Sequence, residues 1–154
     1  MARVLVQQAA FDPGAEIAAL TAGHTDVGGL GLFLGVVRGE AKGRPIVAMT
    51  LEHYPAMTER ALEAIAAEAG ARWPLLGCTV IHRVGRLLPG EPIVLVATTS
   101  AHRAAALEAC AFLIDWLKTR APFWKHEEFA DGGAGWVEAR EEDTAAAARW
   151  RVAP

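Results

Sequence analysis

The pattern of apolar and polar positions along the chain predicts short strands in consecutive pairs, separated by helices. Strands are predicted where apolar residues alternate with polar ones or form short runs bounded by turn residues. Helices are predicted where apolar residues recur at three- and four-residue spacing. The predicted strands are 2–8, 27–39, 46–54, 78–87, 92–100, 123–129 and 136–140, and the predicted helices are 13–23, 57–72, 101–120 and 142–150.

Capping residues and prolines set the predicted helix boundaries. Asp12 is suited to cap the first helix, because Pro13 then occupies the first helical position. Ser100 is predicted to cap the long third helix, which Pro122 stops. Asp143 is predicted to cap the last helix.

The order of elements, β-α-β-β-α-β-β-α-β-β-α, indicates the fold class. Paired strands favour an α+β fold with a mixed or antiparallel sheet over a doubly wound fold, in which strands and helices alternate. In the strand 27–39, glycines indicate bulges or close approach of another backbone segment. The polar segment "GEAKGRP", including Glu40–Pro45, is predicted to be a mobile loop that could become ordered on binding. We find no linker or internal repeat, and expect one domain over residues 1–154.

Composition and charge narrow the possible functions. The 154 residues are 53% hydrophobic, yet no apolar run reaches the roughly 20 residues of a membrane helix. The N-terminal segment does not have the pattern of a signal peptide, so we expect a cytoplasmic protein that does not bind membranes. The net charge of −3 provides no general attraction for nucleic acid. Cys78 and Cys110 have no metal or redox spacing and are predicted to be small core residues.

Two lysines on either side of an aromatic turn are the first candidate site. Lys118 lies near the end of the long predicted helix, and Lys125 follows the segment "PFW". Taken singly, each is typical of a solvated surface. If they come together beside Phe123 and Trp124, burial and like charge would lower a lysine pKa from about 10.4. Such an amine could act as a nucleophile or transfer a proton near neutral pH.

A second candidate site is cationic and suited to an anion. His102 and Arg103 lie at the predicted start of the long helix, where free backbone N–H groups favour phosphate. Arg38 lies at the end of a predicted glycine-rich strand and could project into a cleft. In an isolated pair, however, an exposed arginine and a partly buried histidine are the more common outcome. His102 and Lys118 are also roughly 24 Å apart along one helix, which requires either a long groove or a site completed by a second subunit.

Other catalytic patterns are missing from the sequence. The five histidines show no HExxH or His-x-His spacing, which argues against a metal site. The glycines do not form a nucleotide-binding pattern, and no serine lies in a GxSxG motif.

Six segments in the same order closely resemble the large, catalytic subunit of molybdopterin synthase, the MoaE family. They are "GLFLGVVRG", "LEHYPAMTE", "HRVGRLLPGE", "TSAHRAAALEA", "DWLKTRAPFWKHE" and "WVEAR". The resemblance extends from about residue 28 to residue 150. It departs from the family at Ala56, where glycine is expected, and at His126, where a lysine or arginine is more common.

This resemblance implies an α/β hammerhead fold with an added small subdomain and a sulfurtransferase activity. Enzymes of this family convert cyclic pyranopterin monophosphate (precursor Z) into molybdopterin by building a dithiolene. The sulfur arrives as a thiocarboxylate on the C-terminal Gly-Gly tail of a small ubiquitin-like subunit, which inserts into a pocket of the large subunit. The large subunit forms a homodimer, and a heterotetramer with two small subunits. No metal or other cofactor is implied.

The resemblance also assigns roles to the candidate residues. Lys118 and Lys125 are implied to be catalytic, with Lys118 as the main amine and Lys125 stabilising charge. The implied pterin-binding residues are Phe33, Arg38, His102, Arg103 and, less directly, Arg140. Two alternatives remain: a non-catalytic module that binds a phosphorylated metabolite, and a regulatory ligand-binding domain of ferredoxin-like type.

Overall fold

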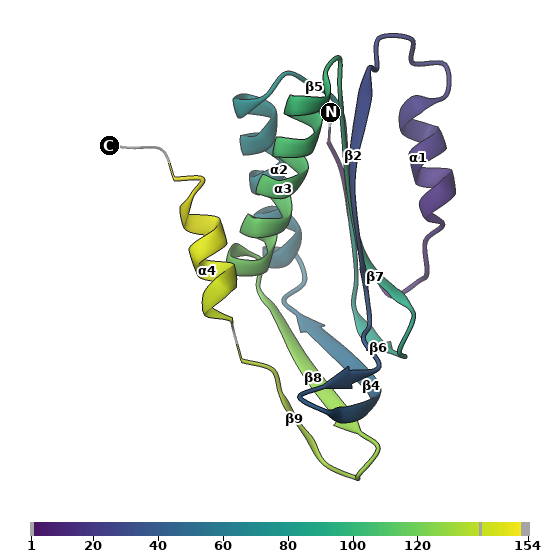
Figure 1. Ribbon diagram of the computed structural model, residues 1–154, viewed down its shortest axis with the longest axis vertical. Coiled ribbons are helices and arrows are strands. Elements are labelled where there is room, and N and C mark those ends of the chain that lie inside the picture. The colour runs from purple at the N-terminus through teal and green to yellow at the C-terminus, as the bar shows by residue number, and fades with distance from the viewer. Residues whose placement is uncertain (1, 139, 152–154) are drawn as a thin grey trace.

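The structure, a computed structural model, describes residues 2–138 and 140–151. Figure 1 shows its helices and strands. In chain order they are β1 (Ala2–Gln7), α1 (Pro13–Thr21), β2 (Gly29–Val36), β3 (Glu40–Ala41), β4 (Arg44–His53), α2 (Met57–Arg72), β5 (Leu75–Arg83), β6 (Gly85–Leu87), β7 (Pro92–Ser100), α3 (Arg103–Arg120), β8 (Phe123–Phe129), β9 (Ala134–Trp136) and α4 (Glu141–Ala148).

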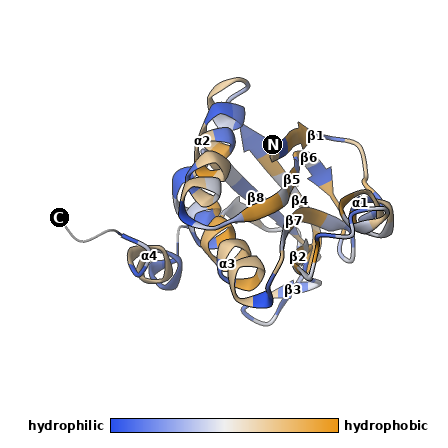
Figure 2. Cartoon of the chain, turned by 90° about the horizontal axis from the view of Figure 1, so that it is seen from above, coloured by the Kyte–Doolittle hydropathy of each residue, from blue (hydrophilic) through white to orange (hydrophobic). Residues whose placement is uncertain are grey.

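The first sheet has the strand order β1-β5-β7-β2. β1 pairs in parallel with β5, whereas the β5–β7 and β7–β2 pairs are antiparallel. Seen from above, α1 lies on one side of these strands, and α2 and α3 lie on the other (Figure 2). This arrangement confirms the predicted α+β class with a mixed sheet.

A second sheet lies at the lower end of the molecule in Figure 1. Its order is β3-β4-β8-β9, and β6 also pairs with β4. β8 follows directly after α3, so the end of the long helix leads into this sheet. The boundary between the two sheets is where the candidate lysines lie.

Glycines in and before β2 allow α3 to pack directly against this strand, as predicted. A Cβ atom at Gly28 would lie 1.9 Å from the backbone oxygen of Ala101, and one at Gly31 would lie 2.5 Å from that of Ala106. Both distances are shorter than any side chain tolerates. The β2–β7 register also shifts between Gly35 and Val36, which is the irregularity expected of a bulge.

The main core lies between the first sheet and the helices α2 and α3. Its largest fully buried side chains include Leu62 of α2, Leu95 of β7 and Phe112 of α3. α4 is held against α3 by two indole N–H groups. Trp116 Nε1 donates to the carbonyl of Ala147 at 3.3 Å, and Trp150 Nε1 donates to Asp115 at 2.6 Å.

Two predicted helix caps are wrong, and one is confirmed. Asp12 caps α1 by accepting hydrogen bonds from the backbone N–H groups of residues 14 and 15. Ser100 instead ends β7, because its hydroxyl donates to the carbonyl of Pro74, and α3 begins only at Arg103. Asp143 lies within the first turn of α4, which starts at Glu141.

Three predicted strands or loops also differ in detail. The predicted strand 78–87 is divided by Gly85, whose φ of 87° is in the left-handed region, and its last part joins the second sheet. Of the predicted strand 136–140, Trp136 is the last residue of β9, residues 137, 138 and 140 are not in a strand, and residue 139 lies outside the described residues. The predicted loop 39–45 contains the two-residue strand β3, paired with the start of β4.

Both cysteines are buried and free, as predicted. Burial raises the pKa of each thiol to about 11, which makes the thiolate scarce. Within the described residues, no helix combines the length and apolar character needed to span a membrane.

Candidate active site

A pocket of about 340 Å³ lies where the end of α3, the start of β8 and the segment before α4 meet. It contains both candidate lysines. The residues that line it are His82, Leu117, Lys118, Ala121, Phe123, Trp124, Lys125, Val137, Glu138, Arg140 and Asp143.

The turn after α3 brings the two lysines together. Pro122 prevents the helix from continuing, and the chain enters β8, which pairs with β4. Thr58 of α2 holds this turn by donating its hydroxyl to the carbonyl of Pro122 at 3.2 Å. Phe123 and Lys125 are two residues apart in β8, so their side chains point to the same face of the strand.

The protein atoms around Lys118 make its ammonium group unusually acidic. Its side chain reaches solvent through the open pocket, while surrounding protein atoms displace much of its hydration shell. This partial desolvation, reinforced by the charge of Lys125, lowers the pKa of Lys118 to about 8. Arg140 lowers this pKa further, and Asp143 partly opposes the effect. A substantial fraction of Lys118 is therefore neutral and nucleophilic near physiological pH.

His82 forms a buried wall of the same pocket. It comes from β5 in the first sheet, and its ring stacks on Phe123 with a centroid distance of 3.8 Å. Burial is the main cause that lowers the pKa of His82 to about 3, and the nearby lysines add to it. The imidazole is thus neutral over the whole physiological range.

Charged residues of both signs line the pocket on the C-terminal side. Arg140 precedes α4 and lies 3.6 Å from Glu142 in an exposed ion pair. Glu138 is exposed, and Asp143 is partly buried. The Trp116 and Trp150 contacts described above hold α4 in place, so this part of the pocket depends on the packing of α4 against α3.

The structure places the other predicted site residues away from this pocket. Phe33 lies on β2, and Arg38 follows that strand. His102 and Arg103 lie at the opposite end of α3 from Lys118. Of the predicted residues, Lys118, Lys125 and Arg140 therefore share one pocket within a single chain.

Three ionisable residues that line the pocket are not among the predicted site residues: His82, Glu138 and Asp143. His82 has no informative sequence spacing, because only the pairing of strands brings the end of β5 to the end of α3. Asp143 was interpreted as a helix cap. The segment "HRVG", which belongs to the family resemblance, is the one signal that could have indicated His82.

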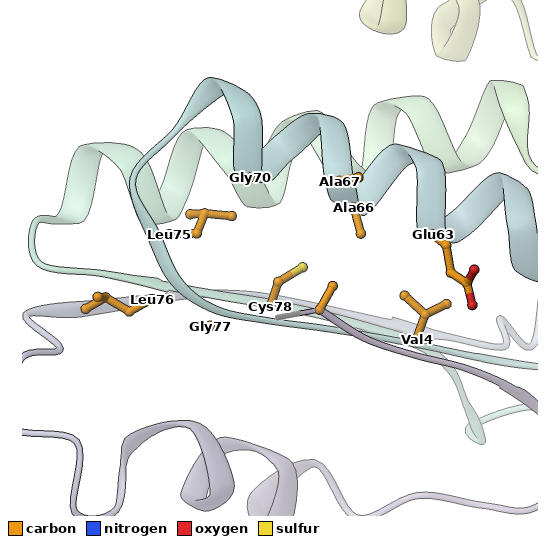
Figure 3. A pocket seen from close by; sticks show the side chains of 10 residues that line it. Val4, Glu63, Ala66, Ala67, Gly70, Leu75, Leu76, Gly77 and Cys78 are labelled. Atoms are coloured by element: carbon orange, nitrogen blue, oxygen red, sulfur yellow. The ribbon is translucent and has the colours of Figure 1, made fainter.

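A larger cavity of about 650 Å³ lies elsewhere, between α2 and the strands β1 and β5 (Figure 3). Its lining is mostly aliphatic, with the Cys78 side chain turned toward α2 and the Glu63 carboxylate at one end. One high-pKa thiol and one distant carboxylate provide no cluster for catalysis. Volume alone therefore does not identify the active site of this protein.

A metal centre finds no support in the described part of the chain. Among residues 2–138 and 140–151, no three His, Cys, Asp or Glu side chains are grouped closely enough to hold a metal ion. The ionisable groups that line the pocket are two amines, a guanidinium, a neutral imidazole and two carboxylates.

Comparison with known proteins identifies the family. Residues 6–120 match the family model described as MoaE protein. The chain belongs to the MoaE family. The molybdopterin synthase catalytic subunit of Pseudomonas aeruginosa is 58% identical over 147 residues, which cover 96% of this chain and 97% of the relative.

Solved structures of the family share the fold. The molybdopterin biosynthesis MoaE protein of Burkholderia ambifaria aligns with a TM-score of 0.83 and 52% identity, covering 99% of this chain and 100% of that one. A complex of subunits 1 and 2 of the molybdopterin-converting factor from Helicobacter pylori aligns with a TM-score of 0.69 over 91% of this chain and 90% of that one. At 22% identity, this last likeness concerns the fold alone. The resemblance predicted from the motifs is confirmed, and MoaE membership makes the chain an enzyme subunit of molybdopterin synthesis.

Proposed function

We propose that this protein transfers sulfur from the C-terminal thiocarboxylate of a small ubiquitin-like subunit to cyclic pyranopterin monophosphate (precursor Z), forming the dithiolene of molybdopterin. The observation that carries the proposal is the pair of amines in one open pocket, with the pKa of Lys118 lowered to about 8. MoaE membership supports the assignment to molybdopterin synthesis.

The two lysines have different proposed roles. Lys118 acts as the nucleophilic or acid–base amine, because a fraction of it is neutral at the pH of the reaction. Lys125 provides a fixed positive charge that keeps the Lys118 pKa low and stabilises the oxyanion that forms on the acyl group. Arg140 adds positive charge at the same pocket.

The phosphate of the pterin requires further cations, which we assign to Arg38, His102 and Arg103. Within one chain these residues are divided between the two ends of the molecule. Gly29, at the start of β2, lies against Arg103, whereas Arg38 follows the end of β2. Because β2 and α3 start side by side and run in the same direction, Arg38 lies toward the same end of the chain as Lys118, though outside its pocket, and His102 and Arg103 lie at the other end.

We propose that a second copy of the chain completes the site across β2. This strand is at the edge of the first sheet, and it exposes Leu32, Leu34 and Val36, which alternation places on one face. A two-fold axis through β2 would set the two strands antiparallel. The start of the partner's β2, with His102 of the partner subunit and Arg103 of the partner subunit, would then lie beside Arg38 and the Lys118 end of the first chain.

The proposed small subunit inserts its Gly-Gly tail into the lysine pocket, and two small subunits with the homodimer make a heterotetramer. The name of the Pseudomonas aeruginosa relative, a catalytic subunit, supports the presence of a further subunit. The tail lacks side chains, so it suits a narrow pocket of about 340 Å³.

Replacement of Lys118 tests the function directly. Purified protein is mixed with a thiocarboxylated small subunit and precursor Z, and the dithiolene pterin is measured. The Lys118→Ala variant should form no product but still bind the small subunit. An exposed arginine far from the pocket, replaced as Arg3→Gln, should leave turnover unchanged.

Two outcomes would contradict the proposal. Near-normal turnover by Lys118→Ala would remove the role of this amine. If the wild-type protein binds precursor Z but forms no dithiolene with the thiocarboxylated partner, a module that binds phosphorylated metabolites becomes the better assignment.

A further inference from the structure

His82 is a buried polar residue that lines the pocket of Lys118 and Lys125, and none of the roles proposed so far involves it. It is 2% exposed and is the one pocket residue that comes from the first sheet. Phe123 covers one face of its ring. The position of the imidazole is therefore fixed by β5 and β8, independently of α4 and of the pocket mouth.

The protonation of this ring follows from its contacts. His82 Nδ1 lies 2.8 Å from the carbonyl oxygen of Arg83, which can only accept a hydrogen bond, so Nδ1 carries the hydrogen. Burial keeps the pKa of His82 at about 3, and the charges of Lys118, Lys125 and His53 act in the same direction. Nε2 consequently presents a lone pair at every pH at which the protein works.

Nε2 also faces open space rather than a protein donor. Among the described residues it has no hydrogen-bond partner. In the same part of the chain, no fully enclosed side-chain nitrogen or oxygen lacks a partner. Nε2 therefore has access to the pocket that His82 lines.

The surrounding groups define what this acceptor can recognise. Lys118 and Lys125 present N–H donors suited to an acyl or anionic group. The carboxylates of Glu138 and Asp143 come from the segment before and within α4, so His82 is the uncharged acceptor on the buried wall. A ligand that hydrogen-bonds both to the His82 acceptor and to the lysine donors carries an N–H group close to an acyl group. The end of a peptide has this arrangement, because one Cα separates the last amide N–H from the terminal acyl group.

We propose that His82 binds the inserted tail by accepting, at Nε2, a hydrogen bond from its last peptide N–H, while Lys118 and Lys125 face the terminal acyl group. This inference rests on the proposed function, since it assumes that the tail of the small subunit enters this pocket. His82 thus sets the depth and direction in which the tail lies. A protonated imidazole would present a second donor to the amide, which explains why a ring that stays neutral suits this position.

The test combines two His82 variants with two forms of the partner. Small subunits ending in Gly-Gly or in Gly-N-methylglycine are prepared by semisynthesis, so that the second lacks the last N–H. Their dissociation constants are measured by calorimetry for the wild-type protein, His82→Gln and His82→Met. Glutamine and methionine have similar lengths, but only glutamine carries a strong acceptor, and both lose the Nδ1 contact. Thermal unfolding of each variant reports any loss of folding.

For the wild-type protein, we expect N-methylation to weaken binding about tenfold, the usual value of one hydrogen bond. His82→Met should bind the normal tail about tenfold more weakly and be insensitive to N-methylation. His82→Gln should retain most of the affinity for the normal tail and most of the sensitivity to N-methylation.

The proposal is overturned if His82→Met is as sensitive to N-methylation as the wild-type protein, or if both variants lose affinity equally. A weaker apparent affinity for precursor Z with unchanged tail binding would assign the acceptor to the pterin instead, and would also overturn it. If the wild-type protein binds neither form of the small subunit, the proposed function itself fails, which is a distinguishable result.

Discussion

At the scale of single residues, the pocket lowers the pKa of one amine by assembling like charges beside it. Lys118 loses hydration and faces Lys125, and each effect disfavours its ammonium form. Asp143 opposes the shift only in part. This balance leaves Lys118 able to change protonation state close to the working pH.

The pH dependence of turnover tests this balance. If the neutral amine of Lys118 is the reactive form, kcat/KM should rise with pH through about 8 and then level off. Lys125→Gln removes the neighbouring charge, so the Lys118 pKa should increase and the rise should move to higher pH. The pH–rate profile of Lys125→Gln is compared with that of Arg3→Gln, which removes a remote positive charge. An unchanged midpoint in Lys125→Gln would contradict the account.

The lysine pair could be predicted from sequence because the turn that joins the two residues is local. Proline and two aromatic residues between them indicated both the turn and the desolvation. His82 could not be predicted in the same way, because its place depends on the pairing of β5 with β1 and β7 and on the stack with Phe123. Its neutral state follows mainly from burial, and its tautomer follows from a backbone carbonyl contact; no sequence pattern encodes either.

At the scale of elements, the site depends on how closely α3 lies on β2. Gly28 and Gly31 let the two backbones approach, and this contact sets the direction of α3 from Arg103 to Lys118. The sequence predicted such an approach from the glycines. It also predicted that β7 ends at Ser100, but it placed the start of α3 at residue 101 instead of Arg103, because Ser100 pairs with Gly29 and Leu75 and does not cap the helix.

Alanine substitutions at two glycines distinguish the effect of close backbone packing on stability from the effect of helix propensity. Gly31→Ala would place a Cβ 2.5 Å from the backbone oxygen of Ala106, so we expect a loss of about 1–3 kcal/mol in the free energy of unfolding. Gly70→Ala, within α2, meets no atom within 4 Å and should stabilise the protein by about 0.5–1 kcal/mol. Chemical denaturation measures both variants. A neutral Gly31→Ala would show that α3 does not depend on this close contact.

At the scale of the whole molecule, the cations proposed for the reaction lie at two ends of one chain. The α+β class and most of the helices and strands could be predicted from local sequence patterns. The division of the strands into two sheets could not. Gly85 turns the end of a predicted single strand into β6, which pairs with β4 in the second sheet. This division places β8, and with it Lys125, beneath the end of α3, and leaves β2 at an open edge.

Mixed dimers provide the most direct test of the central claim, that Lys118 of one chain acts with Arg103 of the partner subunit. Differently tagged Lys118→Ala and Arg103→Ala chains are coexpressed, and dimers carrying both tags are isolated. One of the two sites should then be intact, so turnover should recover to about half of the wild-type value. In the matched control, a wild-type chain paired with a doubly substituted chain should be inactive, because each site contains one altered residue.

The opposite pattern would contradict the account: inactive dimers of the two single variants, together with about half of wild-type turnover in the control. That result would mean that each site is built within one chain.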